Sequence, residues 1–175
     1  QVPLPVGFLP EVYKMVRAQG GVCISDEVQV GFGRLGSWNW GFEKHGVVPD
    51  IVILGKPMGN GHPIGAVVTT TKIASVFDSG PEFFSSFGGN PVSCAAGHAV
   101  LRILEEEGLK EEAHRTGEYL KEAFRYLGAQ HSSIADVRGD GLFLGVELLD
   151  SQGNPDTALA QALKNTLRQS HILIG

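Results

Sequence analysis

Two short apolar runs, each followed at once by a group able to do chemistry, constrain the fold of this chain most. Gly21–Ser25 precedes Asp26-Glu27, and Ile51–Leu54 precedes Gly55-Lys56. Short apolar runs bounded by polar or turn residues predict buried strands, which are typical of parallel sheets covered by helices. Open α/β sheets bind ligands at the carboxyl ends of their strands. The sequence therefore predicts an α/β protein with Asp26 and Lys56 at one edge of a sheet.

The rest of the chain predicts helices between and after these strands. Residues 10–19, 72–77, 91–107, 109–127 and 158–169 have helical spacing or helix start signals, and residues 66–71, 134–138 and 142–148 are strand-like. Early alternation of strands and helices favours a parallel α/β layer over residues 1–105. The later order, with two helices, a strand pair and a helix, predicts a smaller α+β unit over residues 106–175.

Lys56 is the first candidate catalytic residue. A lysine that directly follows a buried strand is poorly hydrated, so its pKa can fall and its amine can attack a carbonyl. The alternative is an ordinary lysine on a surface loop. Asp26 favours the catalytic interpretation. In a cofactor that contains a pyridine ring, a carboxylate beside the ring nitrogen keeps that nitrogen protonated, and the ring then acts as an electron sink. For Asp26 the alternative is a helix cap or a loop carboxylate.

Two other kinds of site match the residues less well. Asp26, Glu27 and His45 lack the spacing of any common metal-ligand set, so no metal site is predicted. Gly31–Gly36 has the G-x-G-x-x-G spacing of a dinucleotide-binding loop, which requires a helix to open at its third glycine. The residues that follow, from Ser37 to Gly41, make a poor helix start, and we expect a long loop over residues 31–50.

Four segments resemble the class-III pyridoxal-phosphate (PLP)-dependent aminotransferases. They are Ile24–Arg34, Pro49–Lys56, Phe87–Pro91 and Val137–Leu142, and they occur in the family's order along nearly the whole chain. The resemblance implies a PLP-transferase of fold type I. Residues 1–105 would be the second half of the large PLP-binding domain, and 106–175 the start of the small C-terminal domain. It also implies a homodimer with its site at the subunit interface.

The resemblance implies a role for each matching residue. Lys56 would carry PLP as a Schiff base and move the proton at the substrate α-carbon. Asp26 would pair with the pyridine nitrogen, Val28 would contact one face of the ring, and Gln29 would donate a hydrogen bond to the phenolic oxygen. Ser86 stands where the family has threonine, and its hydroxyl would bind the cofactor phosphate of the partner subunit. For Glu27 the expectation is a structural role.

The reaction is less closely constrained than the cofactor. Gly33–Ser37 and the Phe87 segment resemble alanine–glyoxylate aminotransferases, which implies transfer of an amino group from an amino donor to a 2-oxo acid or glyoxylate. Gly55–Pro63 is similar to PLP-dependent phospho-lyases, which eliminate phosphate from phosphoethanolamine or phosphohydroxylysine. A third alternative is a non-catalytic assembly module, against which the intact Asp26 and Lys56 weigh.

Composition limits the partners and the location. The net charge of −5 disfavours a nucleic-acid surface, and no apolar run approaches the roughly 20 residues of a membrane helix. Cys23 and Cys94 lie in apolar runs, so we expect both to be buried thiols in a reducing compartment, most simply the cytoplasm. Because the chain starts at Gln1, a mitochondrial location stays open. By the resemblance, the phosphate-binding turn would lie upstream, so the chain alone is expected to be inactive.

Overall fold

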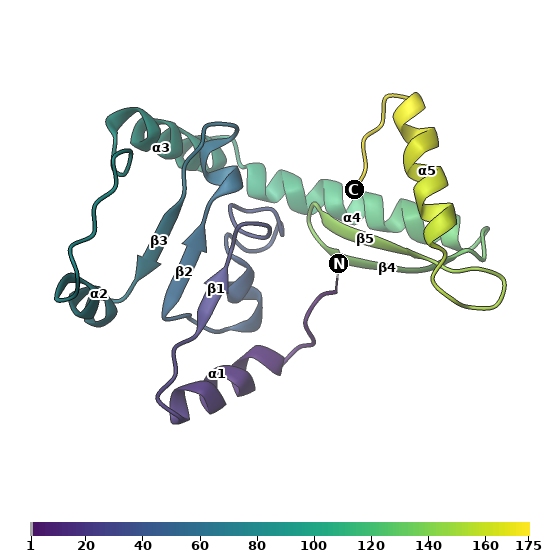
Figure 1. Cartoon of the computed structure of the whole chain (residues 1–175). Coiled ribbons are helices and arrows are strands. Elements are labelled where there is room, and N and C mark those ends of the chain that lie inside the picture. The colour runs from purple at the N-terminus through teal and green to yellow at the C-terminus, as the bar shows by residue number, and fades with distance from the viewer. Residues whose placement is uncertain (1) are drawn as a thin grey trace.

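The computed structural model describes residues 2–175 and is a mixed α/β structure (Figure 1). Its elements, with η for a 3-10 helix, are α1 (Phe8–Ala18), β1 (Ile24–Asp26), η1 (Gly41–His45), β2 (Ile51–Leu54), η2 (Lys56–Gly59), β3 (Ala66–Thr69), α2 (Thr71–Asp78), α3 (Pro91–Glu106), α4 (Leu109–Gly128), β4 (Ile134–Asp140), β5 (Phe143–Leu148) and α5 (Thr157–Gln169). Every predicted helix and strand is present, with ends that differ by a few residues. Along residues 2–175, no helix combines the length and apolar character that crossing a membrane requires.

The first three strands form one sheet in the order β1-β2-β3. β1 and β2 are parallel, as predicted, with Asp26 opposite Ile53. β3 departs from the parallel prediction and runs antiparallel to β2, with Ala66 opposite Leu54. The physical reason is the short connection over residues 55–65, because a parallel pair needs a crossover of about a dozen or more residues that usually includes a helix. The chain therefore reverses at η2, the short helix that begins with Lys56.

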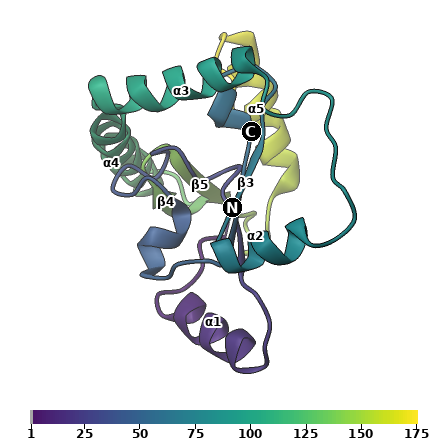
Figure 2. The same cartoon turned by 90° about the vertical axis from the view of Figure 1, so that its left-hand side faces the viewer.

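The strands are less buried in this chain than their apolar sequence predicts. Ile24 in β1 is 54% exposed, and Val67 and Val68 in β3 are also exposed. In Figure 2, α3 lies at one end of the sheet and α1 at the other, so these helices leave much of the sheet uncovered. Exposed apolar surface of this extent is typical of a face that contacts more protein.

The second part of the structure is a hairpin against a long helix. β4 and β5 pair antiparallel around a turn at Asp140–Phe143, close to the predicted turn at Gly139–Gly141. Both strands contact α4, and Figure 1 shows the hairpin lying along this helix. Val137 of β4 and Ala113 of α4 are both buried. This arrangement carries the β4–β5 turn back toward the first sheet.

The cysteine prediction is half right. Cys23 is buried with Tyr13 and Val47 in the small core under α1. Cys94, predicted to be buried, is exposed. The Cys94-Ala95-Ala96 run is apolar, but only Gly97 of α3 is buried, because the helix contacts the rest of the chain through η2 and α4 over a narrow strip.

Asp50 fastens α1 to the start of β2 and sets a pH dependence. Its carboxylate accepts hydrogen bonds from the Cys23 backbone N–H at 2.7 Å and from the Arg17 guanidinium at 3.0 and 3.1 Å. The N–H and then the guanidinium hold the pKa of Asp50 below its usual value of 3.8. A carboxylate with a depressed pKa contributes stability above its unfolded-state pKa and loses it as the pH falls through the folded-state pKa.

We therefore expect Asp50→Asn to lower the melting temperature at pH 7 and to have a smaller effect at pH 3. Differential scanning fluorimetry at both pH values measures this, with Asp78→Asn, an exposed aspartate in α2, as the matched control. Equal effects of Asp50→Asn at both pH values would contradict the ionic contribution.

Candidate functional site

Lys56 begins η2, two residues beyond the end of β2. Its backbone has φ +43°, in the left-handed region that residues other than glycine rarely adopt. The side chain is exposed, and its Nζ donates a hydrogen bond to Gln29 Oε1 at 2.8 Å. The reversal of the chain at η2 thus points the lysine amine at the loop that follows β1.

Asp26, Val28 and Gln29 reach the same place from β1. Asp26 is the last residue of β1, and its Oδ1 accepts a hydrogen bond from the Val28 N–H at 3.0 Å. Val28 is half-buried against Gly55, where an added Cβ would lie 3.6 Å from Val28 Cγ2. Since β1 and β2 are parallel neighbours, their carboxyl ends bring these three residues and Lys56 to one edge of the sheet.

Glu27 is a part of this site whose contacts the sequence did not predict. It is 0% exposed, the most buried large side chain among residues 2–175. Its carboxylate accepts hydrogen bonds from Ser25 Oγ at 2.8 Å, the Gly41 N–H at 2.6 Å and the Phe42 N–H at 3.2 Å. Glu27 therefore ties the first turn of η1 to the end of β1. The available signal was its position beside Asp26, because neighbouring strand residues point to opposite faces.

Ser86 lies on a different segment from the other predicted residues. It is exposed within residues 81–90, together with Phe83, Phe84 and Phe87, which are 71, 82 and 85% exposed. The Phe83 ring contacts the Phe77 ring, with centroids 5.8 Å apart, but all three aromatic side chains remain largely exposed. The predicted contact of Ser86 with a cofactor phosphate would be made by this exposed segment, and it stays a prediction.

His62 connects the Lys56 turn to the start of α3. Its Nε2 lies 2.8 Å from Ser93 Oγ, which also accepts a hydrogen bond from Asn90 Nδ2 at 2.9 Å. Asn90 caps α3 by accepting from the Ser93 N–H, as its position before Pro91 predicts. His62 is thus a loop histidine with a definite side-chain partner in α3.

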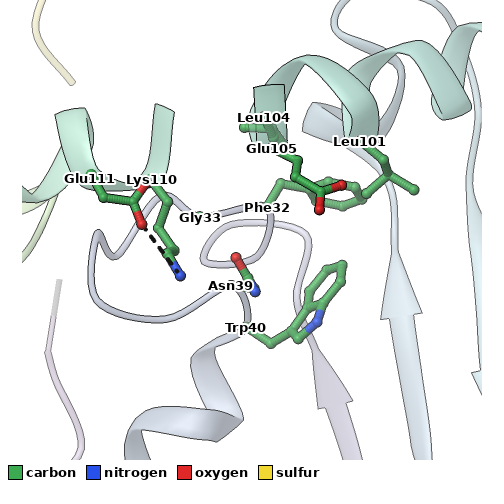
Figure 3. A pocket seen from close by; sticks show the side chains of 9 residues that line it. All are labelled: Phe32, Gly33, Asn39, Trp40, Leu101, Leu104, Glu105, Lys110 and Glu111. Atoms are coloured by element: carbon green, nitrogen blue, oxygen red, sulfur yellow. Dashed lines mark ion pairs between the residues drawn. The ribbon is translucent and has the colours of Figure 1, made fainter. Parts of the chain in front are cut away.

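A separate pocket lies away from this edge of the sheet (Figure 3). It has a volume of about 500 Å³ and lies between the loop after β1 and the junction of α3 and α4. Its lining residues are Phe32, Gly33, Asn39, Trp40, Leu101, Leu104, Glu105, Lys110 and Glu111. Phe32 and Trp40 make an edge-to-face ring contact at 5.0 Å. None of the predicted cofactor-binding residues lines it, so this pocket is separate from the edge that carries Lys56.

Known proteins match most of this chain. It is 51% identical over 174 residues to a Drosophila melanogaster protein named alanine–glyoxylate aminotransferase 2-like, a match that covers 98% of this chain and 35% of that protein. It is 48% identical over 151 residues to human mitochondrial alanine–glyoxylate aminotransferase 2, covering 86% of this chain and 29% of the relative. The chain therefore spans about a third of the length of these curated relatives.

Solved structures give the same picture. A phospholyase from Arthrobacter in complex with phosphoethanolamine superposes with a TM-score of 0.94 at 45% identity, over 98% of this chain and 41% of that one. An S-selective transaminase from Arthrobacter with alanine bound gives a TM-score of 0.89 at 34% identity, over 98% of this chain and 40% of the other. The model of the family described as aminotransferase class-III matches residues 1–170, and the chain belongs to that family.

Proposed function

We propose that the protein to which this chain belongs is a PLP-dependent aminotransferase that moves an amino group from an amino donor to a 2-oxo acid or glyoxylate. Pyridoxal phosphate is the cofactor of class-III aminotransferases. The observation that carries the proposal is the Lys56 amine, 2.8 Å from Gln29 Oε1 at the strand edge that also holds Asp26. The two named relatives favour alanine and glyoxylate as the first substrates to test.

The residues present fit the cofactor by their chemistry. An amine for its aldehyde, a carboxylate for its pyridine nitrogen and an amide for its phenolic oxygen are the donors and acceptors such a ring requires. Lys56, Asp26 and Gln29 supply them at one edge of the sheet, and Val28 offers an apolar surface beside them. Asp26 uses Oδ1 for the Val28 N–H, and within residues 2–175 its Oδ2 has no hydrogen-bond donor. A further donor, such as a protonated ring nitrogen, can therefore be accepted there.

Each side chain has a defined task in this proposal. When bound, PLP supplies an electron sink for the bond changes at the substrate α-carbon. Asp26 holds the proton on the ring nitrogen, because its negative charge favours the protonated form. Lys56 takes and returns the proton at the α-carbon, as a positioned amine can. Gln29 orients the amine through the bond to Nζ, and Glu27 holds the backbone from which Asp26 and Gln29 project.

A second reaction uses the same residues. The phospholyase structure superposes better than the transaminases compared and has the higher identity, 45% against 34% for the alanine-bound transaminase. The sequence of the Gly55–Pro63 segment, which is similar to PLP-dependent phospho-lyases, favours the same reaction. Elimination of phosphate from phosphoethanolamine or phosphohydroxylysine is therefore the alternative candidate function.

The two reactions are distinguished by what is released. The protein at its full natural length, loaded with PLP, is incubated with alanine plus glyoxylate and, separately, with phosphoethanolamine and with phosphohydroxylysine. We expect pyruvate and glycine from the first mixture, and Lys56→Ala should abolish their formation. Inorganic phosphate from either amine, with no pyruvate, would replace the aminotransferase proposal by the phospholyase. No product from any mixture would contradict both.

The proposal extends to assembly, domains and location. The exposed Phe83, Phe84 and Phe87 around Ser86 favour a homodimer in which this segment contacts the partner subunit. Gel filtration with light scattering tests it, and a monomer at micromolar concentration would contradict it.

The division into a PLP-binding domain over 1–105 and a small domain over 106–175 belongs to the same proposal. Human and Arabidopsis thaliana relatives are named mitochondrial, so cell fractionation must choose between mitochondria and the predicted cytoplasm.

A further inference from the structure

Two glycine-rich segments that lie about a hundred residues apart in the sequence meet in the structure. The first is the loop over residues 31–37, which follows Gln29 and has the spacing of a dinucleotide-binding loop. The second is the β4–β5 turn over residues 139–142. The Leu142 N–H donates a hydrogen bond to the Arg34 carbonyl at 2.9 Å, so the two segments are joined backbone to backbone. Neither segment has a task in the proposed chemistry.

Three glycines make this contact close enough to exclude side chains, and we name Gly36, Gly117 and Gly141 the glycine junction. A Cβ on Gly141 would lie 2.7 Å from the Gly36 nitrogen, and one on Gly117 would lie 2.7 Å from the Gly141 Cα. A Cβ on Gly36 would lie 2.6 Å from the Cα of His114 in α4. Close-packed backbone of this kind leaves no room for sliding, so the loop, α4 and the turn hold one relative position.

An ion pair crosses the same contact. Lys44, in η1, pairs with Asp140, at the end of β4. The two side chains are only 22 and 27% exposed, so water screens their attraction less than that of a surface pair. Lys44 stands in the 3-10 helix whose first N–H groups donate to the Glu27 carboxylate. Asp140 is therefore linked through Lys44 and η1 to Glu27, the neighbour of Asp26.

We infer that the β4–β5 turn positions the cofactor-facing residues, and that Asp140 and Lys44 are positioning residues for PLP binding. Two routes carry the effect. The glycine junction fixes the loop that continues directly from Gln29, and the ion pair fixes η1, which is bonded to Glu27. Residues 26–29 are thus held from both the loop side and the η1 side by contacts with the second part of the structure. This inference rests on the proposed function, because it names what supports the PLP site.

The test measures cofactor affinity in the full-length protein stripped of PLP and titrated back, followed by absorbance. The variants are Asp140→Asn, Lys44→Met and the charge-swapped double variant Lys44→Asp with Asp140→Lys. At metal sites, loss of a group that orients the ligands from behind weakens binding by about tenfold or more, and we expect each single variant to raise the PLP dissociation constant by a comparable factor. The swap should recover much of the loss, because it restores the attraction.

A matched control changes a charge that is not at the contact. Glu106→Gln breaks an exposed ion pair with Arg102 on α3 and should leave the PLP dissociation constant unchanged. Melting temperatures of the apo forms are measured alongside. Single variants that lower the melting temperature but bind PLP like the unaltered protein would show a merely structural pair and overturn the inference. Unaltered protein that does not bind PLP would instead refute the proposed function, and the inference with it.

Discussion

Replacing Lys56 by alanine is expected to abolish catalysis, with a loss on the order of 10³-fold or more, because the variant lacks the amine that moves the α-carbon proton. The same variant should lose the covalent link to the cofactor. Borohydride reduction of the full-length protein with PLP, followed by mass spectrometry of the digested protein, locates that link. We expect the modified peptide to contain Lys56 in the unaltered protein and to be absent from the variant.

Two further variants test whether the positive charge alone is sufficient and whether the loss of any lysine has the same effect. Lys56→Arg keeps a cation able to donate to Gln29 Oε1 but cannot form the link, so it should be as inactive as the alanine variant. Lys72→Ala removes an exposed lysine at the start of α2 and should retain activity and labelling. Labelling of a different lysine in Lys56→Ala, with activity retained, would remove Lys56 from the site.

Replacing Glu27 by alanine should produce the largest loss of stability of any single change at the site. The variant would leave the Gly41 and Phe42 N–H groups and the Ser25 hydroxyl without their acceptor, at a position with no solvent access. An unsatisfied buried group costs about 1–3 kcal/mol, so three such groups together cost roughly 3–9 kcal/mol. This is a large share of the roughly 5–15 kcal/mol that stabilises a typical domain. The melting temperature should fall by on the order of 10 °C.

The glutamine variant makes this prediction sharper. In Glu27→Gln the carbonyl oxygen can still accept from Gly41, and the amide can donate to Ser25 Oγ, but the amide then faces the Phe42 N–H. We expect a shift clearly smaller than that of the alanine variant. Glu122→Ala, at an exposed position in α4, is the control for loss of a glutamate as such. A Glu27→Ala protein that melts like this control would mean that water replaces the carboxylate.

The strand ends that carry this site could be predicted from the sequence, but the tertiary contacts that hold these strand ends in place could not. Local pattern sufficed for β2, whose four apolar residues end at Gly55-Lys56, and for the Asn90 cap of α3, because these depend on neighbouring residues alone. The antiparallel direction of β3 depends on the length of the connection over residues 55–65, which is too short for the crossover that a parallel neighbour needs.

The contacts of the loop after β1 could not be predicted in the same way. Gly36 and Gly141 meet because the β4–β5 hairpin lies along α4, and no local pattern encodes a contact across that distance in the sequence. The acceptor role of Glu27 has the same origin, since its partners at Gly41 and Phe42 are brought to it by the path of the loop. Cys94 is a case in which local sequence predicted burial wrongly. Its neighbours in the sequence are apolar, but no other part of the described chain packs over it.

The backbone of Lys56 has a consequence for how this site can evolve. A residue other than glycine in the left-handed region costs about 1–2 kcal/mol, so the backbone carries this penalty at the lysine that we propose to react. Glycine at this position would relieve the penalty and remove the reaction. Selection for stability alone would therefore favour replacement of the lysine. The lysine persists only where the benefit of catalysis outweighs the stability that glycine would add. A degenerate descendant retained for assembly should lose this side chain first.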